Sequence, residues 1–432
     1  MHDGTIVKEY SYRLLNNRVM LMCYALVYSA VIGILYHAVS TIFNEVQGYV
    51  YSVTTAWLLF LSCVLSILPV LYLPLHSTRV SSSILWVVFY VFYVPSVVIS
   101  QYILGYSGID ATNWMILLFL GFSLSISGHY FHVYKFPKLN ISYRGYFLFL
   151  CFFWIIFIVV LYKNFGLSFN FSSLKDVYGH RAEFKSELSS SGSAIAGYVI
   201  ILSGYWLAPA MLLSGVYYAR SHLRYGWWLI CMGMMLSAYV YSIAAFKSIA
   251  LSFVLVFCYA RLMRVNGLVG AKIFFGIMAV VGASWAIASI SGYSFVAHQL
   301  VRRAILSPGM NAAYYFDYFR KPGDIMNLLP AEIISRYYYG TDGNANAGYL
   351  AAGFALLGTW GVVVTGVTMA CALWLANMLT RGVPFILLAA GFFMQSYALS
   401  NSGFGTVMIS YGFIFAALTF YLCPFRDASI KV

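Results

Sequence analysis

The stretch "YRGYFLFLCFFWIIFIVVLYKNF", residues 143–165, decides the fold class of this chain. No charged side chain stands between Arg144 and Lys163, and a helix needs about 20 mostly apolar residues to cross about 30 Å of hydrocarbon. The whole chain shares this character, with 62% hydrophobic residues, 9% charged residues and a mean hydropathy of +0.83. Soluble proteins have about 45–50% apolar and about 25% charged residues. We therefore expect an all-α polytopic membrane protein.

Further apolar runs of this length predict twelve transmembrane helices in a single transmembrane domain, residues 1–432. Residues 1–18 are polar and lack a short apolar region that ends in a small-residue cleavage site, so we expect no cleavable signal peptide. The predicted helices lie near 19–43, 51–74, 82–103, 113–134, 143–165, 193–219, 225–245, 247–263, 268–290, 347–376, 384–400 and 403–423.

The distribution of charge predicts the orientation of the chain. An even number of helices puts both termini on one side, and most of the Lys and Arg residues fall in loops on that side. Because cytoplasmic loops are enriched in Lys and Arg, both termini are predicted to be cytoplasmic. We interpret the net charge of +13 as this signal together with attraction to anionic membrane lipids, which argues against nucleic-acid binding.

The sequence predicts no metal site and no cofactor. All seven cysteines fall within or at the ends of predicted helices, which favours neither a disulfide framework nor a cysteine metal site. His129 and His132 form an HxxH pair without a carboxylate or cysteine near them in the sequence.

Two long loops on the predicted periplasmic side, 166–192 and 291–346, have room for a site, and we interpret them as the first and second catalytic loops. Both retain cations against the orientation rule, so a local role is expected for them. These cations are Lys175, Arg181, Lys185, Arg302, Arg303, Arg320, Lys321 and Arg336.

The second loop reads as short amphipathic helices. The segments "SFVAHQLVRRAIL" (294–306), "NAAYYFDYF" (311–319) and "PAEIISRYYYG" (330–340) are separated by turn residues, and Pro330 stands at a favoured first-turn position. Such helices are expected to lie flat on the outer membrane surface or to fold back over the bundle. Arg320 and Lys321 are interpreted as a solvated turn.

Arginines and tyrosines together at an outer membrane face favour a lipid-linked diphosphate sugar as substrate, because guanidinium groups bind phosphate oxygens as bidentate forks and aromatic faces stack on sugar rings. Lys247, in the short turn "AAFKSIA", either contacts phosphate or extends to the membrane interface. The aromatic clusters at 314–319 and 337–339 have the alternative interpretation of an interfacial belt. Candidate substrate-binding residues are Arg302, Lys247, Arg336, Tyr178, Tyr314, Tyr315 and Tyr338.

The chain resembles the Wzy O-antigen polymerases in its twelve or so predicted spans, in Arg181 of the first loop, and in an arginine followed by "MNAAYYFDYF" in the second. It also resembles them in "GNANAGYLAAGFALLGTWGVV" (343–363), where Asn and Gly residues lead into a Gly-rich helix containing Gly358 and Gly361. Arg181 and Gly192 have the arginine-to-glycine spacing of the family, whereas neither Arg302 nor Arg303 has a glycine at that spacing.

The resemblance implies a metal-independent glycosyltransferase of the GT-C type in the bacterial inner membrane. Its donor and acceptor would be undecaprenyl-diphosphate-linked oligosaccharides, and a chain-length regulator is a further candidate partner. Fixed cations would stabilise the leaving diphosphate, with Arg181 and Arg303 in that role. Glu332 is the first candidate for the general base, Glu183 the second, and His180 and His298 are weaker ones. The structural alternative for Glu332 is an intrahelical ion pair with Arg336.

Two other functions compete with polymerisation. An O-antigen ligase would share the donor and the outer-loop arginines, but the second loop offers only His298 as a catalytic histidine, before the arginines. A lipid-linked oligosaccharide flippase or another transporter belongs to a different class, in which internal repeats and midplane charges are common. The sequence shows no repeat and collects its polar residues in the two loops, which favours chemistry at a surface.

Overall fold

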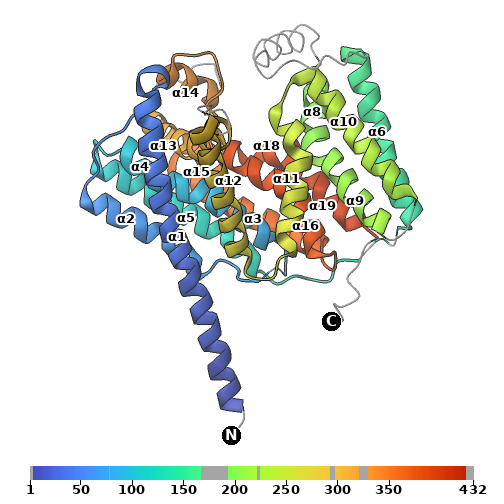
Figure 1. The fold of residues 1–432 in the computed structure, drawn as a ribbon, viewed down its shortest axis with the longest axis horizontal. Coiled ribbons are helices and arrows are strands. Elements are labelled where there is room, and N and C mark those ends of the chain that lie inside the picture. The colour runs from blue at the N-terminus through green and yellow to red at the C-terminus, as the bar shows by residue number, and fades with distance from the viewer. Residues whose placement is uncertain are drawn as a thin grey trace. The chain divides into compact units, whose positions relative to one another are not determined.

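The computed structural model describes residues 3–76, 78–137, 139, 141–166, 193–220, 224–291, 297–320 and 329–424. Within these residues every regular element is a helix, so the predicted all-α class is confirmed. The chain folds into two compact units (Figure 1). Unit 1 contains Met1–Val133, Val265–Asn377 and Ser396–Phe404, and unit 2 contains Tyr134–Arg264, Met378–Gln395 and Gly405–Val432.

Unit 1 is a bundle in which α4 is buried along its whole length. Its helices are α1 (Asp3–Gln47), α2 (Ala56–Ile67), η1 (Leu68–Leu71), α3 (Val80–Val88), η2 (Phe89–Tyr93), α4 (Val94–Ile103), α5 (Gly108–Tyr130), α12 (Val269–Ser291), η4 (Ala297–Leu306), α13 (Ser307–Phe319), α14 (Pro330–Tyr339) and most of α15 (Tyr349–Leu379).

Unit 2 packs α9, α10 and α11 side by side. Its helices are α6 (Tyr143–Phe165), α8 (Ala194–Leu202), η3 (Ser203–Leu207), α9 (Ala208–Arg220), α10 (Tyr225–Ala244), α11 (Lys247–Arg264), α16 (Phe385–Gly391), most of α18 (Phe404–Ile409) and α19 (Phe413–Leu422), while α17 (Phe393–Asn401) contributes to both units.

The stretch at 143–165 forms α6 with the predicted bounds. Ser142 accepts a hydrogen bond from the Gly145 N–H at 3.0 Å, which satisfies one of the free donors of the first turn. Gly166 ends the helix with φ +66°, a conformation that glycine adopts without a steric penalty. A serine cap before the apolar run and a glycine cap after it therefore fix the bounds of this helix.

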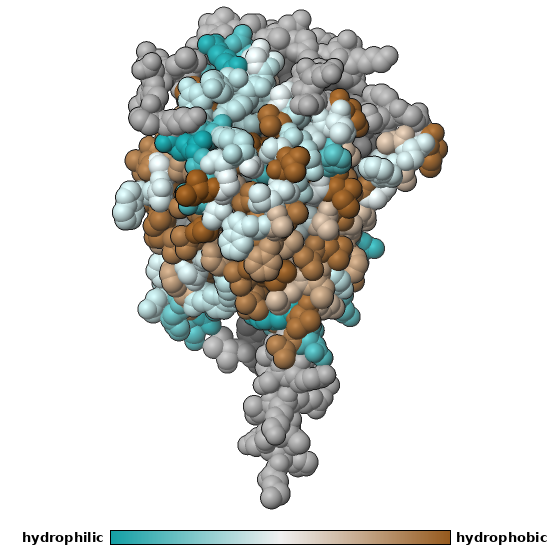
Figure 2. Space-filling view, turned by 90° about the vertical axis from the view of Figure 1, so that its left-hand side faces the viewer, coloured by the Kyte–Doolittle hydropathy of each residue, from teal (hydrophilic) through white to brown (hydrophobic). Residues whose placement is uncertain are grey.

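Nine helices among the described residues are long and apolar enough to cross a membrane, as in a multi-pass membrane protein. All twelve predicted segments are largely helical, but the number twelve is not confirmed. Ala56–Leu71 and Phe385–Asn401 are shorter apolar segments, and α11 carries the three cations Lys247, Arg261 and Arg264. Figure 2 shows hydrophobic side chains across the middle of one face, with hydrophilic ones above and below.

Several apolar segments are irregular inside. The 80–103 and 195–220 segments contain the π-helical stretches η2 and η3, and α18 and α19 are separated by a turn at 410–412. In unit 2 the fully buried Gln395 donates from Nε2 to the carbonyl oxygens of Tyr205 and Tyr411, at 2.8 and 3.3 Å. An amide side chain thus satisfies carbonyl groups at two irregular places, as apolar surroundings require.

Lys247 begins α11 directly after the turn that ends α10. Ala245 has φ +50°, and its N–H donates to the Tyr241 carbonyl at 2.9 Å. The predicted short turn is therefore confirmed. The Lys247 side chain lies outside the described part of the structure, so its contact with phosphate stays a prediction.

Candidate functional site

The candidates of the first loop, Tyr178, His180, Arg181 and Glu183, lie outside the described residues, and so does the side chain of His298. Their roles stay predictions. The second loop carries most of the described candidates, and its helices η4, α13 and α14 all belong to unit 1.

Helix α13 is inserted into unit 1. This excludes the first of the two expected arrangements, a helix flat on the membrane surface, and places α13 deeper than the second, a helix folded back over the bundle. Residues Pro308–Phe316 are all buried. A Cβ added to Gly309 would stand 2.7 Å from the Pro95 carbonyl carbon, so the two backbones touch well inside the Val80–Ile103 segment. Asn311 is the one polar residue among Pro308–Ala313, and the burial of this segment in unit 1 removes its apolar surface from solvent.

Helix α14 is amphipathic, as predicted, and lies beside α13 (Figure 1). Ile333 and Ile334 are buried, whereas Arg336 and Tyr337 on the other side are exposed. The helix ends at Gly340 with φ +61°. The described part of the second loop therefore combines a buried helix and a half-exposed one.

The Gly-rich segment expected to form one helix is a hairpin of two. Leu357 and Gly358 leave helical geometry, and Gly358 has φ +58° and ψ −142°. A Cβ on Gly361 would lie only 1.8 Å from the Gly353 carbonyl oxygen, so the two halves of α15 fold back against each other at these glycines. Glycine at 358 permits the positive φ, and the missing side chains permit the close approach.

The start of this hairpin is deep in unit 1. Tyr349 Oη is hydrogen-bonded to Ser125 Oγ at 2.9 Å, in the second half of α5. A Cβ on Gly348 would overlap the Phe92 ring, at 2.2 Å from its nearest atom. The chain is therefore already inside the bundle where the first half of α15 begins.

Tyrosines of α13 and α14 hold the two helices together. Tyr314 is 1% exposed, donates to the Gly48 carbonyl at 2.6 Å, and stacks on Tyr338 with 4.1 Å between ring centroids. Tyr339 donates to Asn311 Oδ1 at 2.7 Å. Tyr315 is 3% exposed. Tyr314 and Tyr315 are therefore core residues of unit 1, and neither forms part of an exposed interfacial belt.

Arg302 and Arg303 lie in different environments. Arg302 is 4% exposed, donates from Nη1 to Tyr49 Oη at 3.1 Å, and places its guanidinium 5.6 Å from the centre of that ring. Arg303 is exposed. In this structure the exposed Arg303 can contact a ligand. The buried Arg302 instead holds η4 against Tyr49 inside unit 1.

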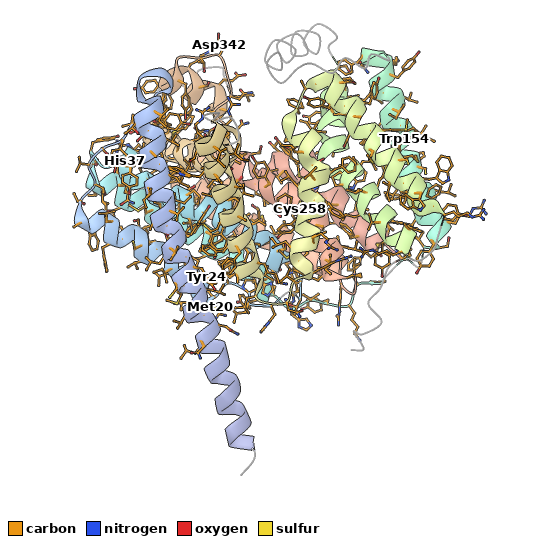
Figure 3. All side chains as sticks on the ribbon, in the orientation of Figure 1. Met20, Tyr24, His37, Trp154, Cys258 and Asp342 are labelled. Carbon is orange, nitrogen blue, oxygen red and sulfur yellow. The ribbon has the colours of Figure 1, made fainter. Side chains whose placement is uncertain are left out.

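Glu332 and Arg336 do not pair with each other, which corrects the structural alternative for Glu332. Arg336 Nε stands 3.0 Å from Asp342 Oδ1, and Asp342, labelled in Figure 3, lies at the same end of unit 1 as α14. The Glu332 carboxylate is partly exposed and makes no ion pair with any described residue. It is therefore open to a substrate hydroxyl, as a general base must be.

A polar network joins α13, α14 and the start of α5. Arg320 forms ion pairs with Asp110 and, at 3.2 Å, with Asp317. Tyr106 and Tyr338 both donate to Asp317, the latter at 2.6 Å, and Arg320 donates to Tyr106 Oη at 3.1 Å. The interpretation of Arg320 as part of a solvated turn is therefore wrong, because two carboxylates hold its half-buried guanidinium.

The network shifts the acidity of its members. Burial opposes ionisation of Asp317, but hydrogen bonds from Tyr106 and Tyr338 and the charge of Arg320 hold the pKa of its carboxyl below the usual value. Burial and the hydrogen bond to Asp317 raise the pKa of Tyr106 to about 12. Asp317 and Arg320 therefore stay charged at neutral pH.

This network borders a cleft of about 630 Å³ in unit 1. The lining combines hydrogen-bonding groups with flat rings, a combination suited to an uncharged polyhydroxylated ligand. The polar lining is Asp110, Asn113, Arg320 and Thr359, and the aromatic lining is Phe316, Phe319 and Phe354. Gly358, at the turn of the α15 hairpin, also lines it.

Sequence reasoning did not find this cleft. Asp110 lies before the predicted start of its span at 113, whereas α5 begins at Gly108, so it read as a loop residue. Asp317 and Arg320 are three residues apart inside an aromatic run, which is the spacing of neighbours on a helix. The spacing of Asp317 and Arg320 could have predicted their ion pair. The sequence around Asp110 does not indicate that this residue also pairs with Arg320.

The described residues contain no group of three or more His, Cys, Asp or Glu side chains that could hold a metal ion. Comparison of the chain with family models, curated proteins and solved structures gave no match. No relative therefore assigns a role to any residue of the cleft.

Proposed function

We propose that this chain polymerises oligosaccharide repeat units linked to undecaprenyl diphosphate, at the periplasmic face of a bacterial inner membrane. The observation that supports this proposal best is the 630 Å³ cleft, where carboxylate, amide, hydroxyl and guanidinium groups stand beside three phenylalanine rings. Sugars present the same combination of hydroxyl groups and apolar ring faces. The cleft suits one sugar of the acceptor repeat unit.

The exposed cations of the second loop suit the donor diphosphate. Arg303 and Arg336 are exposed on η4 and α14, and the pairing of Arg336 with the highly exposed Asp342 is weak enough to exchange for phosphate. Arg181 would bind from the first loop. Guanidinium groups placed where the leaving diphosphate gains negative charge would lower the barrier of the transfer.

The proposed reaction is a single displacement at the anomeric carbon of the donor. A hydroxyl oxygen of the acceptor sugar forms the new glycosidic bond while the bond from the anomeric carbon to the diphosphate oxygen breaks. The proton of the hydroxyl passes to the Glu332 carboxylate, and the bonding electrons leave with the lipid diphosphate. Charge and atoms balance without an additional reactant.

A flippase or another transporter is the second candidate. The observation in its favour is the set of interrupted apolar helices, with breaks at Gly358, at Phe392 and at 410–412, because transporters use discontinuous helices to build substrate sites. A ligase would use the same donor and the same exposed arginines, and no described residue favours it over the polymerase.

A deletion strain distinguishes the three functions. Loss of a polymerase leaves the lipid A-core with a single repeat unit, whereas loss of a ligase or a flippase leaves it with none. Silver-stained gels of the surface glycan show the number of repeat units on the core. A strain with the gene restored from a plasmid is the control. A bare core would contradict the proposal, and so would an unchanged long glycan.

A further inference from the structure

Three arginines of unit 2 converge on one small cavity. Arg220 is the last residue of α9, and Arg261 and Arg264 stand in the last turn of α11. All three are exposed, and all three line a cavity of about 50 Å³ between α9, α11 and α16. The ends of helices favour cations here, because carbonyl groups give a helix C-terminus partial negative charge.

No carboxylate in the described part of unit 2 can pair with them. The acidic residues in the sequence of this unit are Asp176, Glu183, Glu187 and Asp427, and all four lie outside the described residues. The described part of unit 2 is therefore purely cationic among its charged groups. Three arginines that line one cavity attract an anion.

The cavity continues into an apolar groove. Leu212 and Phe257 line both the arginine cavity and a groove of about 610 Å³ between α10 and α11. Met234, Val254 and Phe257 along this groove are 57%, 58% and 51% exposed. Cys258, labelled in Figure 3, marks the same part of α11. A lipid with an anionic head group and an apolar tail could therefore place its head at the arginine cavity and its tail in the adjoining groove.

We propose that this surface binds one anionic glycerophospholipid. Its phosphate lies among Arg220, Arg261 and Arg264, and an acyl chain lies in the groove past Phe257. The groove favours a lipid over free phosphate, because inorganic phosphate gains nothing from apolar walls. Basic pockets between membrane helices bind lipid head groups in this way. This site is separate from the proposed catalysis and does not depend on it.

Native mass spectrometry of the purified full chain tests the site. The protein in detergent is mixed with phosphatidylglycerol, or with phosphatidylethanolamine that has the same acyl chains. The detergent is then removed in the mass spectrometer, and the lipid molecules that remain bound to each protein are counted. We expect one phosphatidylglycerol to be retained preferentially. Each Arg→Gln substitution should weaken its binding about fivefold, because one cation near a lipid surface contributes about that much. The R220Q/R261Q/R264Q variant should lose about a hundredfold.

The matched control is K135Q/R144Q/R224Q, which removes three exposed cations of the same unit that do not line the cavity. It should retain phosphatidylglycerol like the wild type. V254W fills the groove while every charge remains, and it should also reduce retention. If the triple arginine variant fails to fold, the fivefold losses of the single variants and the effect of V254W carry the test.

Three outcomes would overturn the proposal. Equal retention of the two lipids would show that the anionic head is not recognised. If the control variant lost as much phosphatidylglycerol as the triple arginine variant, the binding would depend on the net charge of the protein and not on this cavity. Displacement of the lipid by excess inorganic phosphate, with V254W unaffected, would assign the arginines to a free anion.

Discussion

Arg302 and Arg303 are neighbours in the sequence, and burial alone separates their roles. Arg302 is enclosed against Tyr49, while Arg303 is exposed on the same helix. The sequence placed two cations in the second loop and could not say which of them faces outward, because η4 is a π-helix and its side chains do not follow the usual 3.6-residue repeat.

Arg303→Lys should lower the polymerisation rate roughly a hundred- to a thousandfold, because an ammonium cannot replace the bidentate guanidinium at a developing anion. Arg181→Lys should behave in the same way. Arg144→Lys, at an exposed position of α6, is the control and should keep wild-type activity. Time courses with purified enzyme measure the rates. A fully active Arg303→Lys protein would remove this residue from the reaction.

Asp317→Asn should destabilise unit 1, because Asp317 accepts hydrogen bonds from Tyr106 and Tyr338 and pairs with Arg320. Hydrogen bonds to a charged group are each worth about 1.5–3 kcal/mol. The midpoint temperature from size-exclusion chromatography after heating measures the loss at pH 7. Asp342→Asn removes a carboxylate that is 86% exposed and should leave the midpoint unchanged.

The same pair of proteins gives a pH prediction. The folded pKa of Asp317 lies below its ordinary value of 3.8, so its stabilisation is present above that value and is lost as the pH falls through the folded pKa. The difference in midpoint temperature between the wild type and Asp317→Asn should therefore shrink below about pH 4. A constant difference down to pH 3 would contradict a charged Asp317 in the network.

At the scale of elements, the α15 hairpin depends on two glycines for two different reasons. Gly358→Ala places a Cβ at positive φ in open space, and Gly361→Ala places one against the Gly353 backbone. Each should destabilise the protein by about 1–3 kcal/mol. Gly282→Ala meets no atom within 4 Å in α12 and should leave stability unchanged or slightly higher. Equal midpoint temperatures for the three variants would argue against the hairpin.

The sequence predicted the apolar helices well and their interruptions poorly. α6 has the predicted bounds because one apolar run stands between Ser142 and Gly166. The break at Gly358 was missed because glycine is common in membrane helices and an apolar run continues across it. The burial of α13 was missed for another reason, since its fit against Pro95 depends on residues far apart in the sequence.

At the scale of the whole molecule, charge distribution predicts the orientation. Reporter fusions at Asn140 and Val432 should be active as cytoplasmic reporters, and fusions at Ser189 and Asp324 as periplasmic ones. A fusion at Arg79, in a loop predicted to be cytoplasmic, serves as an internal control. A cytoplasmic Ser189 would overturn the assignment of both catalytic loops.

The polymerisation reaction tests the central claim most directly. Purified protein is mixed with an undecaprenyl-diphosphate-linked repeat unit in EDTA, and the products are separated on a gel over time. Because the sequence places arginines and no paired acidic motif in the outer loops, we predict a ladder of growing glycans that forms in the presence of the chelator. A lipid that stays at one repeat unit, with or without Mg²⁺ or Mn²⁺, would contradict polymerase function. A ladder that requires one of those ions would contradict the arginine mechanism.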